Sequence, residues 1–117
     1  MSKLLKNNIP FLQNLATATA ADRKHLIENA SVEEIKVLTE IAMNITKGHF
    51  PVTHKHFHRL KRHKHIIRKL ASASIPHKAK KVILNQKGGF LPILVAPILA
   101  ALGSIAGRLI SYHLGLT

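Results

Sequence analysis

The chain contains no cysteine and no tryptophan, and only five of its 117 residues are acidic. The absence of cysteine excludes disulfide scaffolds, thiol catalysis and zinc sites with thiolate ligands, and it leaves the redox compartment open. Aromatic residues are scarce, with four Phe and one Tyr, and there are only five Pro and six Gly. The apolar content is therefore mainly Leu, Ile and Ala, which is typical of an all-α protein.

Positive charge is what the sequence has in excess. Eighteen Lys and Arg against five acids give a formal net charge of +13. A charge of this size says nothing about the fold, but it implies an anionic partner, either nucleic acid or an anionic membrane surface. The N-terminal residues contain no apolar signal-peptide core before the Asn-Asn-Ile-Pro break, so we expect no signal peptide.

The charge divides the chain into three blocks. Residues 1–47 hold six Lys or Arg and all five acids, whereas residues 48–89 hold eleven Lys or Arg, seven of the nine His and no acid. Residues 90–117 hold a single charge. We therefore expect a helical N-terminal unit, a basic helical nucleic-acid-binding region at 48–87, and a Gly-Gly hinge with an apolar segment at 88–117.

The first block has the start and stop signals of helices. Pro10 suits the first turn of one helix, and Thr19 can cap a second over residues 20–29. Ser31 and Glu34 fit a capping box, and Gly48 marks the end of the helix that follows it. Apolar residues recur along this helix at steps of three and four, which indicates one buried face: Val32, Ile35, Leu38, Ala42 and Ile45.

The basic block predicts two further helices. Thr53 is a candidate cap for the first, over residues 54–72, in which Lys64 interrupts the apolar stripe, and Ser74 is a candidate cap for a short second helix. Residues 85–89 are expected to form a linker. The cations of this helix pair are the side chains that we expect to contact phosphate groups: Lys55, Arg59, Lys61, Arg62, Lys64, Arg68, Lys69, Lys78, Lys80 and Lys81.

The sequence indicates neither an enzyme nor a metal site, and no cofactor is expected. No two carboxylates are spaced to flank a substrate, and there is no phosphate-binding loop, glycine fingerprint or nucleophile elbow. His54 and His58 share a helix face as two metal ligands would, but their neighbours are cations. The better interpretation is a solvated helix face whose imidazoles gain positive charge below about pH 6.5. A pH-dependent affinity for nucleic acid is a weaker hypothesis.

Residues 90–107 form an uncharged apolar segment of eighteen residues, which approaches the roughly 20 that a membrane-spanning helix needs. Its two Pro and two Gly argue against a simple span. Three interpretations stay open: a core or capsid-docking helix, a membrane-inserting segment, or an oligomerisation face. The third would use the small residues Ala96, Ala100, Gly103 and Gly107.

The stretch Lys87-Gly-Gly-Phe-Leu-Pro-Ile-Leu-Val-Ala-Pro-Ile-Leu-Ala-Ala-Leu-Gly-Ser-Ile-Ala-Gly107 resembles the C-terminal segment of the adenovirus core protein X (mu precursor) family. The whole chain is similar to small basic proteins of Maverick/Polinton elements and their adintovirus relatives. The resemblance implies association with packaged DNA, a place in the virion and the host nucleus, and proteolytic processing near Gly88 and Gly89. The adenovirus protease prefers Met, Ile or Leu two residues before the Gly pair, where this chain has Gln86.

These observations predict an all-α protein, a small bundle of about five short helices with a basic helix pair and an apolar C-terminal helix. The function that we expect is non-specific binding and condensation of nucleic acid, DNA more than RNA, as a minor core protein of a virus-like element. Capsid protein or membrane could contact residues 90–107, and oligomerisation is open. The alternatives are a membrane-active lytic or antimicrobial-like protein and a sequence-specific transcription or chromatin factor.

Overall fold

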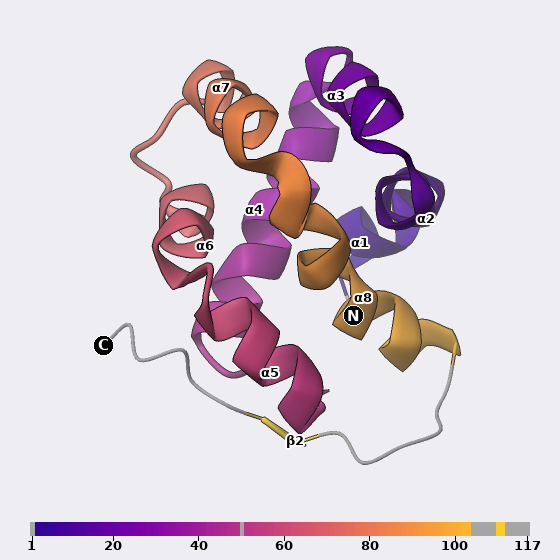
Figure 1. Cartoon of the computed structure of the whole chain (residues 1–117), viewed down its shortest axis with the longest axis vertical. Coiled ribbons are helices and arrows are strands. Elements are labelled where there is room, and N and C mark those ends of the chain that lie inside the picture. Colours follow the sequence, from indigo (N-terminus) through magenta and orange to yellow (C-terminus); the bar gives the residue numbers. More distant parts are fainter. Residues whose placement is uncertain (1, 50, 104–109, 112–117) are drawn as a thin grey trace.

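The computed structural model describes residues 2–49, 51–103 and 110–111, and the chain folds as the predicted all-α protein (Figure 1). The first block forms α1 (Lys3–Asn7), α2 (Ile9–Thr17), α3 (Ala20–Glu28) and α4 (Val32–Thr46). The basic block forms α5 (His54–Lys61), α6 (Lys64–Ala71) and α7 (His77–Lys87). A 3-10 turn, η1 (Gly88–Phe90), leads into α8 (Leu91–Gly103), and two short strands, β1 (Pro51–Val52) and β2 (Ile110–Ser111), pair antiparallel.

The helix boundaries follow the capping signals of the sequence. The Thr19 hydroxyl accepts a hydrogen bond from the amide of Asp22 and so caps α3. Ser31 and Glu34 form the complete capping box of α4, with distances of 3.1 Å and 2.9 Å. Gly48 ends this region with φ of 71°, a left-handed conformation that glycine adopts without steric cost. These three predictions are confirmed, and Thr53 caps α5 as expected.

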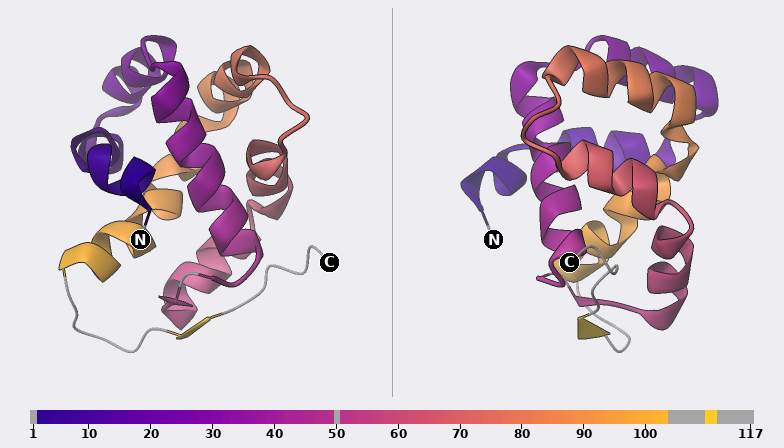
Figure 2. Two further views of the ribbon diagram at one scale, coloured as in Figure 1. Left: turned by 180° about the vertical axis from the view of Figure 1, so that it is seen from behind. Right: turned by 90° about the vertical axis from the view of Figure 1, so that its left-hand side faces the viewer.

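The central element is α4, whose buried side chains contribute to one hydrophobic core (Figure 2). The helix α6 packs against it, α7 and α8 also contact it, and α2 packs against α8. Because α4 is contacted by helices from both sides, its buried positions exceed a single narrow stripe. They are Ile35, Val37, Leu38, Ile41, Ala42, Ile45 and Thr46.

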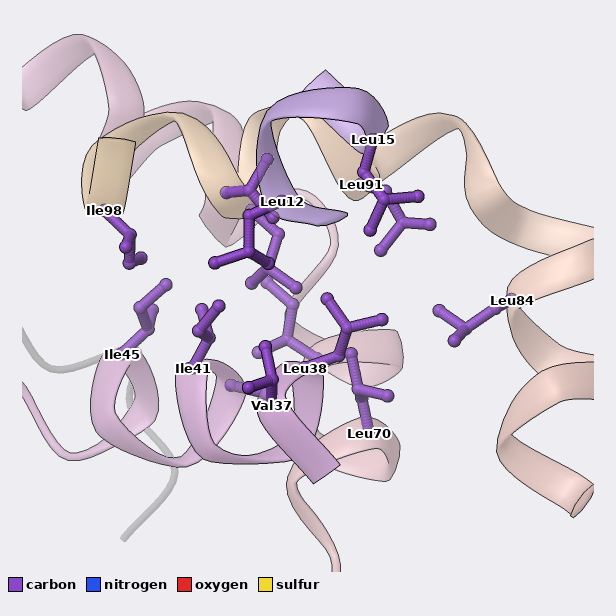
Figure 3. Packing of buried hydrophobic residues seen from close by; sticks show 14 of the residues in the cluster. Leu12, Leu15, Val37, Leu38, Ile41, Ile45, Leu70, Leu84, Leu91 and Ile98 are labelled. Carbon is purple, nitrogen blue, oxygen red and sulfur yellow. The ribbon is translucent and has the colours of Figure 1, made fainter. Parts of the chain in front are cut away.

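The apolar segment forms part of this core. Phe90, Leu91, Leu94, Val95 and Ile98 are almost completely buried, together with residues of α2 and α4. Figure 3 shows Leu91 and Ile98 of α8 among the leucines and isoleucines of these two helices. Among the interpretations left open by the sequence, residues 90–98 therefore fit the core helix. Residues 104–107, which include Gly107, lie outside the described residues.

The linker expected at residues 85–89 is a wrong prediction. Asn85, Gln86 and Lys87 are the last residues of α7, and Gly88 continues in a helical conformation with φ of −66° and ψ of −9°. Leu84 on one side and Phe90 on the other are both buried, so the backbone between them is held by packing at each end. Tertiary packing has overridden the turn propensity of the Gly pair.

The helix expected over residues 54–72 is broken in two. Arg62 keeps helical dihedral angles, whereas His63 has φ of −110° and ψ of 18°, and α6 starts at Lys64. In an unbroken helix Lys64 would lie on the buried stripe between Leu60 and Ile67. The break leaves Lys64 partly exposed while both apolar residues stay buried.

The cap predicted for the following helix is also wrong. Ser74 does not cap α7, which begins at His77 after Pro76 and has no side-chain cap. The Ser74 hydroxyl is instead 2.8 Å from that of Ser72, and the Ser74 amide donates to the same Ser72 oxygen at 3.3 Å. Short hydroxyl side chains commonly form such local hydrogen bonds, and here the bond between the two serines competes with capping of α7.

Candidate nucleic-acid interface

The three basic helices lie on the same side of the molecule. When that side faces the viewer, α6 and α7 run across it and α5 lies beside them (right-hand view of Figure 2). Leu60 of α5 and Ile67 and Leu70 of α6 are buried in the core. These apolar anchors fix which faces of α5 and α6 point inward, so their cations are turned toward solvent.

Seven of the ten cations predicted to contact phosphate are exposed. Two more, Lys64 and Lys81, are partly buried, and the ammonium group of Lys81 donates to the carbonyl oxygen of Glu28 at 3.3 Å. We call the exposed set the basic face; it comprises Lys55, Arg59, Lys61, Arg62, Arg68, Lys69 and Lys78.

Lys80 does not belong to this surface, which corrects its predicted role. Its side chain is 2% exposed, and its ammonium nitrogen donates to Oγ1 of Thr39 at 2.8 Å. Burial lowers the pKa of this lysine. A phosphate could reach Lys80 only if α7 separated from α4. The sequence predicts a phosphate contact here because Lys80 belongs to a block of cations that contains no acid.

The acidic groups lie on α3 and α4, and α3 packs against α7. All five precede residue 41, and three of them have hydrogen-bond partners in the N-terminal half. The Ser2 hydroxyl donates to Glu40 at 2.6 Å, the Asn8 amide donates to Glu33 at 3.4 Å, and Glu34 closes the capping box. The elements α5, α6 and α7 themselves contain no carboxylate, so the charge that they carry is positive.

The histidines of the basic block do not assemble into a metal centre. Within residues 2–49, 51–103 and 110–111 there is no group of three or more His, Asp or Glu that could hold a metal ion. His54 and His58 are exposed on α5, and the His58 ring meets Phe57 edge-on, with ring centroids 5.8 Å apart. The His63 ring lies 5.8 Å from that of Phe90, which joins the helix break to the core.

His56 is the histidine whose titration the fold alters most clearly. Burial lowers its pKa, and the positive charges of Arg59 and Lys55 lower it further. Its Nδ1 atom is buried and has no hydrogen-bond partner among the described residues. His56 is therefore held neutral to a lower pH than an ordinary histidine, and it contributes less charge to the surface.

The Gly pair with a predicted role in processing lies inside folded structure. Gly88 is partly buried and Gly89 exposed, both in η1, and Phe90 directly after them is 1% exposed. Proteases bind their substrates as extended chains, so cleavage between these residues would require local unfolding of η1. Processing at Gly88 and Gly89 stays a prediction.

Length and composition also leave α7 and α8 as a membrane candidate. The continuous helical stretch His77–Ala100 has 24 residues and is apolar enough to cross a bilayer by length and composition alone. In the fold, however, its second half supplies core residues that include Leu94 and Ile98.

Comparison of the chain with protein families, with curated proteins and with solved structures finds no match.

Proposed function

We propose that this protein binds nucleic acid without sequence specificity through the basic face and condenses DNA as a minor core protein of a virus-like particle. The observation that carries the proposal is the exposure of seven cations on three helices that contain no acidic residue. Such a surface repels itself in isolation, and a polyanion relieves that repulsion. DNA offers one phosphate per about 1.7 Å of helix axis, so several cations can be neutralised together.

Lack of sequence specificity follows from the type of contact. Lysine and arginine bound to phosphate oxygens position a protein on a duplex but do not distinguish base pairs. The exposed side chains of the basic face are long and flexible, and they are distributed over three short helices instead of one. We therefore propose electrostatic binding to the backbone in place of a recognition helix in the major groove.

The place in a virion rests on the resemblance to the adenovirus core protein X family and to the small basic proteins of Maverick/Polinton elements. The match between Lys87-Gly-Gly-Phe-Leu-Pro92 and the C-terminal segment of core protein X carries it. In this proposal the protein neutralises packaged DNA in the particle and reaches the host nucleus with it. A capsid contact through residues 90–107 would use the side of α8 that is not in the core, where Ala100 is exposed.

A salt titration tests the basic face. With roughly six to eight phosphate contacts, the slope of log K against log salt concentration should be about −5 to −7. Gln substitution of Lys61, Arg62, Arg68 and Lys69 should flatten the slope by about 3 to 4, since each lost contact removes about 0.9. Fluorescence anisotropy with a labelled duplex measures both slopes.

The matched control removes the same charge from the N-terminal block. Lys3, Lys6, Lys36 and Lys47 are exposed residues of α1, α4 and its C-cap, and their substitution by Gln lowers the net charge equally. This variant should keep most of the wild-type slope. Equal flattening in both variants would mean that net charge alone, and not the basic face, determines binding. Strong preference for one of two unrelated duplexes would instead favour a transcription or chromatin factor.

A membrane-active protein is the second candidate, and the length of His77–Ala100 is the observation that favours it. Insertion would have to extract Leu91, Leu94 and Ile98 from the core, so the protein would have to unfold at the bilayer. Leakage of dye from anionic vesicles, together with no affinity for DNA at physiological salt, would support this candidate over the first.

A further inference from the structure

A second cationic site lies where α3 meets the end of α7, apart from the basic face. A cavity of about 300 Å³ opens between these helices, which lie at the top of Figure 1, and the turn η1, which contacts both of them. Both Arg23 and Lys24 of α3 line it. The remaining wall comes from Ala20 and from the end of α7 with its Gly pair: Leu84, Asn85, Gln86, Gly88 and Gly89.

The glycines keep this cavity open beside the arginine. A Cβ atom placed on Gly88 would lie 3.8 Å from Nε of Arg23, so the guanidinium stem passes directly over the turn. A Cβ atom on Gly89 would meet no atom within 4 Å, which shows that open space borders this residue. Side chains at the two positions would fill the volume that the Gly pair leaves free.

The two cations have no counter-charge in the cavity. Among the residues that the structure describes, the side chains of Arg23 and Lys24 make no hydrogen bond or ion pair, and no carboxylate lines the cavity. The neighbouring Asp22 lines a different cavity, on the side of α3 that faces α2. An anion that enters between α3 and η1 would thus meet two positive groups and no negative one.

The side chain of Asn85 adds a polar group that is not satisfied by the fold. Its Oδ1 atom is buried and has no hydrogen-bond partner among the described residues. Because Oδ1 is buried, the NH2 group is the part of this amide that is left to face the cavity, and it can donate. The cavity is therefore lined by donors from both helices, the guanidinium of Arg23 and the ammonium of Lys24 on α3 and the NH2 group of Asn85 on α7.

We propose that this cavity binds a phosphate group. A guanidinium matches the oxygens of phosphate with paired hydrogen bonds, and a lysine adds a point charge. The volume of about 300 Å³ is at the lower end of small-molecule sites and accommodates a phosphate or a phosphate monoester with water. The proposal uses none of the seven cations of the basic face, so the two sites can be tested separately.

Amide chemical shifts give the direct test. The intact protein, labelled with 15N, is titrated with sodium phosphate and, in parallel, with sodium chloride at equal ionic strength. Phosphate should cause saturable shifts of the Gly88 and Gly89 amides and of the Asn85 side-chain amide, and chloride should not. Shifts that grow linearly with both salts would overturn the proposal, because they would report ionic strength alone.

Substitutions assign the shifts to the cations. The double variant R23Q/K24Q should weaken phosphate binding at least tenfold, whereas R23K, which keeps the charge but loses the planar fork, should weaken it by less. The control K36Q/K47Q removes two exposed charges elsewhere and should bind as the wild type does. If R23Q/K24Q loses helicity by circular dichroism, K24Q alone is compared, since Lys24 is exposed. Equal binding by the variants and the control would contradict the site.

The source of the phosphate is distinguished by three probes: inorganic phosphate, a nucleoside monophosphate and a 5′-phosphorylated oligonucleotide. Saturation by the first two indicates a small-anion site, and tighter saturation by the oligonucleotide as well indicates a nucleic-acid phosphate; either outcome supports the site. Saturation by the oligonucleotide alone would report binding at the basic face and overturns the site. Saturation by none of them overturns it. Because R23Q/K24Q leaves the basic face intact, failure here would not alter the salt slope expected from the proposed function.

Discussion

The ammonium nitrogen of Lys80 lies 2.8 Å from Oγ1 of Thr39 and donates a hydrogen bond to it across the interface of α7 with α4. On the same helix, Lys78 is exposed and Lys81 is partly buried. The bond therefore places one lysine of a basic segment in the interior, where its ionised form is disfavoured by loss of hydration.

Lys80 should make the stability of the fold depend on alkaline pH. Burial lowers the pKa of Lys80 in the folded chain, so the unfolded chain binds more protons between that pKa and the ordinary value of 10.5. The free energy of unfolding should therefore rise with pH across this window. Urea denaturation between pH 7 and 10 measures the rise.

The double variant T39V/K80M separates this effect from the general loss of positive charge. It replaces both partners of the hydrogen bond by apolar groups, so at pH 7 it should be as stable as the wild type within about 1 kcal/mol, or more stable. Its free energy of unfolding should rise less with pH. The variant K78M, at an exposed position of α7, should retain the wild-type dependence. A double variant with the same pH profile as the wild type would show that Lys80 ionises freely.

Because α8 is part of the core, truncation of one of its buried side chains should lower the free energy of unfolding substantially. Leu94 is fully buried, and its replacement by Ala should lower the free energy of unfolding by about 2 to 5 kcal/mol. Replacement of Val82, which is 56% exposed, by Ala serves as the control and should change it by less than about 0.5 kcal/mol. Chemical denaturation followed by circular dichroism measures both.

A chain that ends at Gln86 extends this test to the whole segment. Were residues 88–117 a separate tail, such a chain would keep its helices and the affinity for DNA that we propose. Because α8 packs on α2, α4 and α5, we expect loss of helicity and weaker binding together. Retained helicity would mean that α8 contributes little to the stability of the bundle.

Acid should weaken the fold through His56. Its pKa is lowered by burial and by Arg59 and Lys55, so between that value and 6.5 the unfolded chain binds more protons. The free energy of unfolding should accordingly fall as the pH decreases from 7 through the folded pKa. Thermal unfolding of H56Q should show a smaller decrease than that of the wild type. The control H65Q, at an exposed residue of α6, should follow the wild type.

Local signals in the sequence predicted the N-terminal half well. The capping residues interact only with backbone atoms a few positions away, so the helix ends that they set can be predicted without knowledge of the fold. These residues are Thr19, Ser31, Glu34 and Gly48. The break at His63 and the helical state of Gly88 were missed because both depend on distant packing partners. The sequence did contain one indication of the break at His63, because the charged Lys64 interrupts the apolar stripe of the predicted helix.

The candidate sites also combine features that the sequence reveals with features that depend on tertiary packing. A run of cations without acids is visible in composition, and it identified most of the basic face. The interior place of Lys80 and the pairing of Arg23 with Gly88 depend on how α7 lies against α4 and α3. No spacing along the chain expresses that arrangement, so neither could be predicted from the sequence.

The packing of α8 on α2 also determines the order in which the chain can fold. Helices such as α4 form from contacts between near neighbours, whereas α2 and α8 lie at opposite ends of the described chain and must find each other by a long loop closure. Until α8 docks, the apolar sides of α2 and α5 lack one of their partners. The cations of the basic face are already charged at that stage, so a polyanion can hold the chain before the bundle closes. A nucleic acid that binds the basic face as proposed would thus compete with folding, and refolding in its presence should be slow.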